Sequence, residues 1–194
     1  MGSGAIKLMI TDFDGTLVNT YAANLAAYQK AFAQLGLNLL AEEYRRCFGY
    51  RFERFMQEVG ILDKEIAEQI KRLKSQYYPE FFDRLQVNTP LLEMLRAFRR
   101  SGGLTAIAST ARRVNLCNAL SYIGAQEDFD LVLAGEDVVE GKPSPEIYLT
   151  VLDRMNISSD EAIVFEDSEV GFAAAKSAGI RYVKITESFY GNRG

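Results

Sequence analysis

Two carboxylates placed one residue apart, directly after an apolar run, are the residues best suited to chemistry in this sequence. Asp12 and Asp14 follow the run Ile6–Ile10 and lead into a turn that contains Gly15. If the run is a strand, side chains two positions apart lie on the same face. Two negative charges held that close are unfavourable unless a cation or a proton separates them. The pattern therefore predicts a metal-assisted reaction in which one carboxylate is the nucleophile and the other carries a proton.

Further polar groups follow later apolar runs. Ser109 and Thr110 carry hydroxyls that could bind a phosphate oxygen near the start of a helix. Lys142 supplies a positive charge, and the proline after it biases its backbone toward an extended conformation. Glu166 and Asp167 form a second acidic pair. Because ligands bind outside the carboxyl ends of parallel strands, we expect all these groups to meet the first acidic pair at one site.

The oxygen atoms of this set suit a magnesium ion. Mg²⁺ commonly binds one or two carboxylates together with substrate phosphate and water. Asp12 and Asp167 could supply the carboxylates, while Lys142 and Ser109 could hold the side of the phosphate that faces away from the metal.

The composition excludes several other mechanisms and partners. The 194 residues include no histidine, which excludes a Ser-His-Asp triad, a Cys-His pair and a His-ligated zinc. The formal net charge is -4 and Lys and Arg are not clustered, so we expect no nucleic-acid partner. No apolar run approaches the roughly 20 residues of a membrane span. Cys47 and Cys117 have no CxxC spacing, and we interpret them as reduced thiols of a cytoplasmic protein. We expect this acidic protein to be a monomer.

Short apolar runs alternate with longer stretches of helical periodicity. This alternation predicts an α/β fold with a mostly parallel, Rossmann-like sheet that has helices on both faces. The predicted strands are Ile6–Ile10, Leu104–Ala108, Leu131–Ala134, Ala162–Phe165 and Tyr182–Ile185. The predicted helices cover 90–101, 112–123, 145–155 and 169–178. We expect Ser144 to cap the third of these with Pro145 as its first residue, and Gly179 to end the fourth.

A different pattern runs from residue 20 to residue 84, where helical periodicity occurs without a convincing strand. We interpret 20–84 as a helical cap inserted after the first strand of a core that comprises 1–19 and 85–194. The expected helices are Tyr21–Leu35, Ala41–Phe48, Phe52–Val59 and Asp63–Tyr77, with breaks near Gly36, Gly49 and Gly60. The expected linkers are Gly15–Asn19 and Asp83–Thr89. A cap of this kind could close over a site at the strand ends and exclude water.

Taken together, these motifs resemble those of the haloacid dehalogenase superfamily of phosphohydrolases. The matching segments, in family order, are Asp12–Leu17, Ser109-Thr110, Gly141–Pro143 and Glu166–Ser168. The resemblance covers nearly the whole chain, and four motifs in order are far more specific than the first one alone. The helical insertion resembles the cap of the β-phosphoglucomutase and phosphoglycolate phosphatase branch.

The resemblance implies a role for each site residue. Asp12 attacks phosphorus and forms an aspartyl-phosphate, while Asp14 protonates the leaving oxygen and then takes a proton from water. The phosphoryl group is bound by Gly15, Ser109, Thr110 and Lys142. The ligands of Mg²⁺ are Asp12, the backbone carbonyl of Asp14, Asp167 and, as a further candidate, Glu166. The alternative for Glu166 is a carboxylate that interacts with the N-terminus of the following helix.

The cap carries candidate substrate-binding residues. These are Asn24, Gly49, Arg51 and Arg54. Arginine suits recognition of a carboxylate or a second phosphate, although solvated charges on helices are an equally good interpretation. Sugar-phosphate mutases of the branch carry a histidine where this chain has Asn24, which favours a phosphatase.

Three functions follow from these observations. The first is a Mg²⁺-dependent phosphatase acting on a small phosphorylated metabolite, such as a sugar phosphate or phosphoglycolate. The second is a phosphomutase or phosphotransferase that uses the same nucleophile. The third is a catalytically inactive binding protein, against which the intact Asp12, Asp14 and Lys142 argue.

Overall fold

The computed structural model describes residues 5–186, which divide into two compact units. One unit comprises the chain up to Asn19 together with the part from Gln86 onward. The other is Thr20–Leu85, where the sequence predicts an insertion over 20–84. Within the described residues, no helix is both long enough and apolar enough to cross a membrane.

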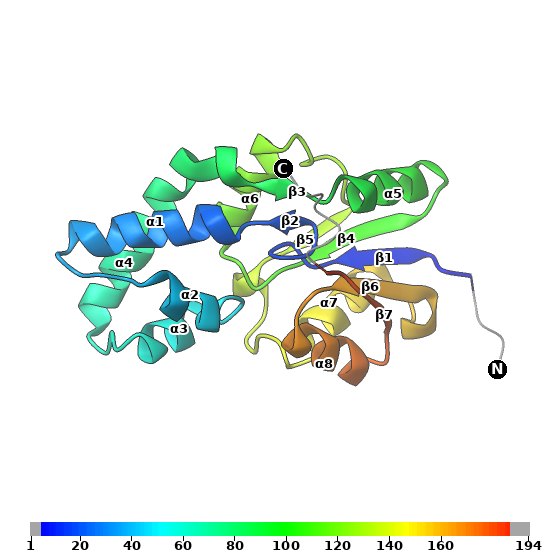
Figure 1. Ribbon diagram of the computed structural model, residues 1–194. Helices are drawn as coiled ribbons and strands as arrows, with labels where there is room; N and C mark the ends of the chain where they lie inside the picture. Colours follow the sequence, from blue (N-terminus) through cyan, green and yellow to red (C-terminus); the bar gives the residue numbers. More distant parts are fainter. Residues whose placement is uncertain (1–4, 187–194) are drawn as a thin grey trace. The chain divides into compact units, whose positions relative to one another are not determined.

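The first unit contains a five-stranded parallel sheet, which confirms the predicted α/β class (Figure 1). Its strands are β1 (Leu8–Thr11), β4 (Leu104–Ala108), β5 (Leu131–Leu133), β6 (Ala162–Glu166) and β7 (Arg181–Lys184). They lie in the order β5-β4-β1-β6-β7. The chain thus winds outward from β1 to β5 and then returns to add β6 and β7 on the other side of β1. The winding direction therefore reverses between β1 and β6, and ligands of such sheets bind at this reversal.

Helices cover both faces of the sheet. They are α5 (Thr89–Arg100), α6 (Arg113–Tyr122), α7 (Glu146–Met155) and α8 (Glu169–Ser177), with short 3-10 turns at Gly135–Asp137 and Ser159–Glu161. In Figure 1, α7 and α8 lie on one side of the sheet and α5 lies on the other. Leu8, Ile10 and Val164 point from the strands into a core that Tyr148 and Val151 of α7 complete. Burying each of the aliphatic side chains stabilises the fold by about 1.5–3 kcal/mol.

The ends of α7 and α8 bring loops to the carboxyl edge of the sheet. Ser168 caps α8, because its Oγ accepts a hydrogen bond from the Gly171 N–H at 3.1 Å. Gly179 follows the last residues of this helix with a φ of 71°, as predicted. The prediction that Pro145 is the first residue of its helix is wrong by one position. Pro145 is the N-cap of α7, and the Ser144 Oγ accepts from the Glu146 N–H at 3.3 Å.

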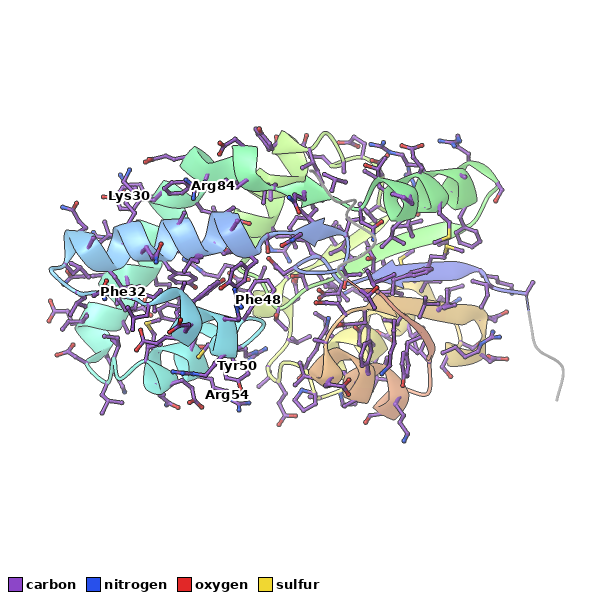
Figure 2. All side chains as sticks on the ribbon, viewed as in Figure 1. Lys30, Phe32, Phe48, Tyr50, Arg54 and Arg84 are labelled. Atoms are coloured by element: carbon purple, nitrogen blue, oxygen red, sulfur yellow. The ribbon has the colours of Figure 1, made fainter. Side chains whose placement is uncertain are left out.

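The second unit is helical and has its own core. Its elements are α1 (Tyr21–Gln34), α2 (Ala41–Cys47), α3 (Phe52–Glu58), α4 (Lys64–Tyr77) and the 3-10 helix η1 (Tyr78–Arg84). Gly36, Gly49 and Gly60 take positive φ values at the breaks between the first four helices. Inside this unit the ring of Tyr44 packs edge-on against Phe48 and Phe55. Phe32 is buried in the same core (Figure 2).

The two linkers between the units differ from the prediction. They form a small antiparallel ribbon, in which β2 (Val18–Asn19) pairs with β3 (Gln86–Val87). The sequence predicts plain linkers here, because a strand of two residues leaves no alternation of apolar and polar side chains.

Candidate active site

The register of the sheet places the two acidic motifs side by side. Thr11 is the Cα partner of Phe165 across β1 and β6, and the Asp12 N–H donates to the Phe165 carbonyl at 3.0 Å. Asp12 and Glu166 are therefore neighbours at the carboxyl ends of adjacent strands. This is the point at which the winding of the sheet reverses.

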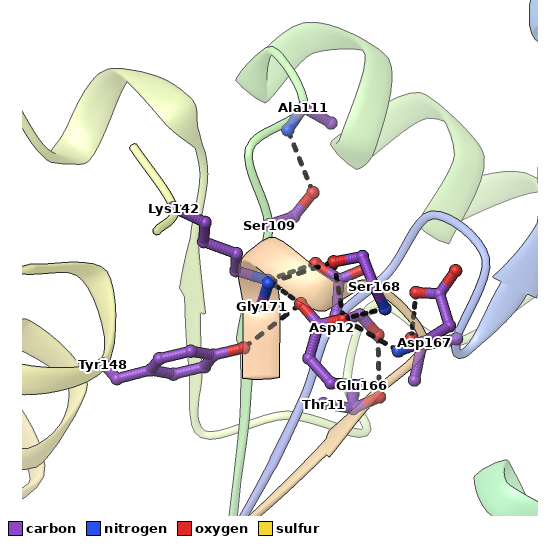
Figure 3. A network of polar contacts seen from close by, with 11 residues as sticks. Thr11, Asp12, Ser109, Ala111, Lys142, Tyr148, Glu166, Asp167, Ser168 and Gly171 are labelled. Carbon is purple, nitrogen blue, oxygen red and sulfur yellow. Dashed lines mark hydrogen bonds and ion pairs between the residues drawn. The ribbon is translucent and has the colours of Figure 1, made fainter. Parts of the chain in front are cut away.

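Lys142 joins this pair from the loop before α7. Its Nζ lies 2.6 Å from Asp12 Oδ1 and 2.6 Å from Glu166 Oε1, and its side chain is only 3% exposed (Figure 3). Segments 130 residues apart thus meet in one ion-paired cluster. An ammonium group this deeply buried is stable only with such partners.

Glu166 accepts hydrogen bonds on both of its oxygens. Oε1 accepts from Lys142 and, at 3.4 Å, from the hydroxyl of Tyr148. Oε2 accepts from the backbone N–H groups of Asp167 and Ser168 at 2.7 and 2.8 Å and from the Ser168 hydroxyl at 3.0 Å. The carboxylate therefore interacts with the N-terminal turn of α8, as the alternative interpretation of this residue predicts, and it also holds Lys142.

Two glycines make room for the acidic side chains. Gly15 has a φ of 88°, and a Cβ built on it would overlap the Asp167 carboxylate. A Cβ on Gly171 would overlap the carboxylate of Glu166. Asp167 is held over Gly15 by the Thr16 hydroxyl, which donates to its Oδ1 at 2.8 Å.

Three carboxylates form a cluster of oxygen atoms that could bind a metal ion: those of Asp12, Glu166 and Asp167. Each offers a carboxylate oxygen, and these three atoms lie within 4.8 Å of one another. Burial, reinforced by the other two carboxylates and opposed by Lys142, holds the pKa of Asp12 well above its ordinary value. Burial together with Glu166 raises the pKa of Asp167 to about 6, although the bond from Thr16 opposes this. Carboxylates crowded into one site raise one another's pKa in this way, and a bound cation relieves the repulsion between them. The donor set therefore fits a hard cation such as Mg²⁺.

Lys142 and Glu166 behave as a charged pair within the cluster. Burial lowers the pKa of Lys142, but Asp12, Tyr148 and Glu166 outweigh it and keep this pKa well above its ordinary value. Burial likewise opposes ionisation of Glu166, but Lys142 and the hydrogen bonds from Ser168 hold its pKa below the ordinary value. The ammonium and the carboxylate are therefore both ionised.

Ser109 and Asp14 lie at the same edge of the sheet. Ser109 follows β4, is 1% exposed, and accepts a hydrogen bond on Oγ from the Ala111 N–H at 3.0 Å (Figure 3). It is not the N-cap of α6, since that position belongs to Arg112. Asp14 is half-buried in the turn that the Gly15 N–H closes on the Val18 carbonyl at 2.8 Å. Thr110 is half-buried beside Ser109.

The candidate substrate residues of the insertion belong to the second unit. The cluster of carboxylates around Lys142 belongs to the first unit. Asn24 is buried on α1, Gly49 follows α2, and Arg51 is the N-cap of α3. The Arg54 guanidinium lies over the ring of Tyr50, 4.0 Å from its centroid, and is 58% exposed (Figure 2). This environment is typical of a solvated charge on a helix.

Tyr148 and the two glycine contacts were not predicted from the sequence. Tyr148 lies on the buried face of α7 with Val151 and Leu152, at spacings of three and four residues. A tyrosine on an apolar helix face needs a partner for its hydroxyl, and this need is the feature that could have drawn attention to it. Gly171 is required because α8 packs so close to the Glu166 carboxylate that a Cβ would overlap it, and no local pattern in the sequence shows this.

Asp167→Asn is expected to stabilise the metal-free protein at pH 8. The pKa of about 6 in the folded protein exceeds the ordinary value of 3.8, so the folded state keeps a proton that the unfolded chain has released. Stability therefore falls as the pH rises through this window. Above it, the ionised carboxylate costs at most about 3 kcal/mol, which asparagine avoids. Thermal unfolding in EDTA should give a higher Tm for the variant at pH 8 and equal values below pH 4.

Asp153→Asn provides a matched control, because Asp153 is exposed on α7. Its Tm in EDTA at pH 8 should match that of the wild type. Added Mg²⁺ should raise the Tm of the wild type more than that of Asp167→Asn. A variant less stable than the wild type at pH 8 in EDTA would contradict the placement of Asp167 in a crowded anionic cluster.

Comparison with known proteins agrees with this geometry. A family model described as haloacid dehalogenase-like hydrolase matches residues 9–185. The chain is 30% identical over 182 residues to a phosphorylated carbohydrates phosphatase of Thermotoga maritima, covering 92% of this chain and 84% of the relative. It is also similar to two crystal structures of CbbY from Rhodobacter sphaeroides, each covering 97% of this chain and 90% of the other. One, in complex with phosphate, has a TM-score of 0.85 at 28% identity. The other, a variant in complex with xylulose-(1,5)bisphosphate, has a TM-score of 0.83 at 27% identity.

Proposed function

The chain belongs to the haloacid dehalogenase-like hydrolases, and from this premise we propose that it is a Mg²⁺-dependent phosphatase of a small phosphorylated carbohydrate. The coarser assignment, a phosphoric monoester hydrolase, rests on the family and on relatives named as phosphatases. One observation of this chain carries the proposal. Lys142 is held at 2.6 Å from Asp12 at the sheet edge where Asp167 also lies, which supports a site where the proposed nucleophile, a cation and a proposed metal ligand converge.

In the proposed reaction, Asp12 is the nucleophile. Its carboxylate oxygen forms a bond to phosphorus while the bond to the leaving oxygen breaks, and Asp14 protonates that oxygen to release an alcohol. Water then attacks the phosphorus of the aspartyl-phosphate and loses its proton to Asp14. The bond between phosphorus and Asp12 breaks, which releases inorganic phosphate and restores the Asp12 carboxylate and the protonated Asp14.

On the side that faces away from the metal, the phosphoryl group needs positive charge and hydrogen-bond donors. Lys142 supplies an ammonium that stays ionised because carboxylates surround it. Ser109 can donate its hydroxyl proton, because its oxygen already accepts from Ala111. The backbone near Gly15 and the hydroxyl of Thr110 complete the proposed phosphate site. Such preorganised donors supply most of the stabilisation in phosphoryl transfer.

Asp12 and Asp167, with the backbone carbonyl of Asp14, are the groups that we propose hold Mg²⁺. When bound, the ion neutralises charge on the phosphoryl oxygens. Glu166 is close enough to be a ligand, yet both of its oxygens accept hydrogen bonds from protein donors. We therefore assign Glu166 to holding Lys142 and the start of α8.

A phosphomutase is the second candidate, because it would use the same nucleophile. It needs a general base for the sugar hydroxyl that accepts the phosphoryl group. The sugar-phosphate mutases of the branch carry a histidine where this chain has Asn24, and the chain contains no histidine. A phosphatase, which needs only water as acceptor, is therefore favoured. The substrate class follows the relatives, and Arg51 and Arg54 remain candidates for contacting its non-reacting end.

The test is a panel of sugar monophosphates, sugar bisphosphates and phosphoglycolate, assayed with Mg²⁺ and with EDTA. Inorganic phosphate should be released from at least one carbohydrate phosphate with Mg²⁺ and not with EDTA, and phosphorus NMR should detect no isomerised sugar phosphate. An isomerised product would instead establish the mutase. Absence of turnover across the whole panel with Mg²⁺ present would support the inactive binding protein.

A further inference from the structure

Tyr148 is the largest fully buried side chain of the described residues, and in Figure 3 it reaches the proposed site from the left. It projects from α7, and its hydroxyl lies 3.4 Å from Glu166 Oε1 (Figure 3). The Lys142 Nζ lies over its ring, 5.1 Å from the centroid. Burial raises the pKa of Tyr148 above its ordinary value, so the hydroxyl keeps its proton and can donate to Glu166.

Lys142 needs such a neighbour because its side chain is flexible. A lysine has a four-carbon stem and three donors that rotate freely, so one ion pair does not fix where the ammonium points. Two of the donors are directed at Asp12 and Glu166. The ring of Tyr148 restricts the movement of the Lys142 side chain from another direction. It also attracts the ammonium by a cation–π interaction.

The same helix also holds the loop that carries Lys142. The Glu146 carboxylate, in the first turn of α7, accepts from the backbone N–H groups of Val139 and Glu140 at 2.8 and 2.6 Å. The backbone before Lys142 is therefore attached to the helix that presents Tyr148. Residues of α7 therefore contact both the ammonium of Lys142, through Tyr148, and the backbone before Lys142, through Glu146.

We propose that Tyr148 is a positioning residue, whose ring and hydroxyl hold the ammonium of Lys142 between Asp12 and Glu166 so that it faces the phosphoryl group. This inference rests on the proposed function. It assigns Tyr148 no contact with substrate, and its effect on the reaction passes through Lys142. Loss of the side chain should therefore weaken every interaction in which Lys142 takes part.

Two variants separate the hydroxyl from the ring. Tyr148→Phe keeps the ring and should lower kcat about threefold to tenfold, while Tyr148→Leu removes both and should lower it more than tenfold. KM should change less than kcat, because the charge that Lys142 stabilises increases in the transition state. The affinity for inorganic phosphate, measured with Mg²⁺ by calorimetry, should fall in the same order.

Val151→Ala is the matched control. Val151 lies one turn along α7 in the same core and is fully buried, so this variant destabilises the helix without touching Lys142. It should lower the Tm and leave kcat and phosphate affinity unchanged. A folded Tyr148→Leu protein with wild-type kcat and wild-type phosphate affinity would overturn the inference, as would equal losses in Val151→Ala. Phosphate binding is measured without turnover, so this result is distinct from a failure of the proposed activity.

Discussion

Asp12→Asn is expected to abolish Mg²⁺-dependent phosphate release while leaving the fold intact. The amide has nearly the shape of the carboxylate, but it cannot form the aspartyl-phosphate, so kcat should fall at least about 10³-fold. The fold should persist because the variant also relieves repulsion between Asp12 and its acidic neighbours, which offsets the lost pairing with Lys142. Phosphate release and thermal unfolding, measured on the same preparation, test both parts.

The exposed Asp153→Asn variant controls for loss of a carboxylate elsewhere on the same unit and should retain full activity. Turnover of Asp12→Asn within tenfold of the wild type would refute the assignment of the nucleophile.

Lys142→Met should have the second largest effect, because it removes the ammonium from a cluster of carboxylates. We expect kcat/KM to fall by about 10²–10³-fold, as when a preorganised charge on the reacting group is lost. The variant should also be less stable at pH 8 by about 3–5 kcal/mol, because it leaves buried carboxylates without their partner. Protonation relieves that penalty, so the loss should shrink toward pH 5.

Lys176→Met, at an exposed position on α8, is the control for removing a lysine and should match the wild type in both measurements. Thermal unfolding in EDTA at pH 8 and pH 5 gives the stability difference. A Lys142→Met protein that is equally destabilised at both pH values would contradict the charge argument, and one with normal kcat/KM would remove Lys142 from the site.

The strands and the acidic motifs were predictable because each leaves a local pattern. The run before Asp12 and the run before Glu166 are short, apolar and followed directly by carboxylates, and the structure has β1 and β6 within two residues of the predicted ends. Parallel strands then force these carboxylates to the same edge of the sheet.

The hydrogen bonding of Glu166 was predictable only in part: one interpretation placed it at the N-terminus of the next helix, but its partners Lys142 and Tyr148 come from a distant segment. The family resemblance implies Glu166 as a further candidate metal ligand beside Asp167. The structure directs its oxygens to Lys142, Tyr148 and the first N–H groups of α8. The space that Gly171 leaves for this carboxylate depends on the approach of α8 to β6, which no local pattern encodes.

The most direct test of the account is to trap the intermediate on Asp12. The wild-type protein would be mixed with Mg²⁺ and its best substrate, quenched, and treated with borohydride, which reduces an acyl phosphate to an alcohol. Peptide mass spectrometry should find homoserine at position 12 with substrate present, and unmodified aspartate without substrate or without Mg²⁺. Reduction at another acidic residue, or phosphate release with position 12 unmodified under every quench time, would contradict the proposed reaction.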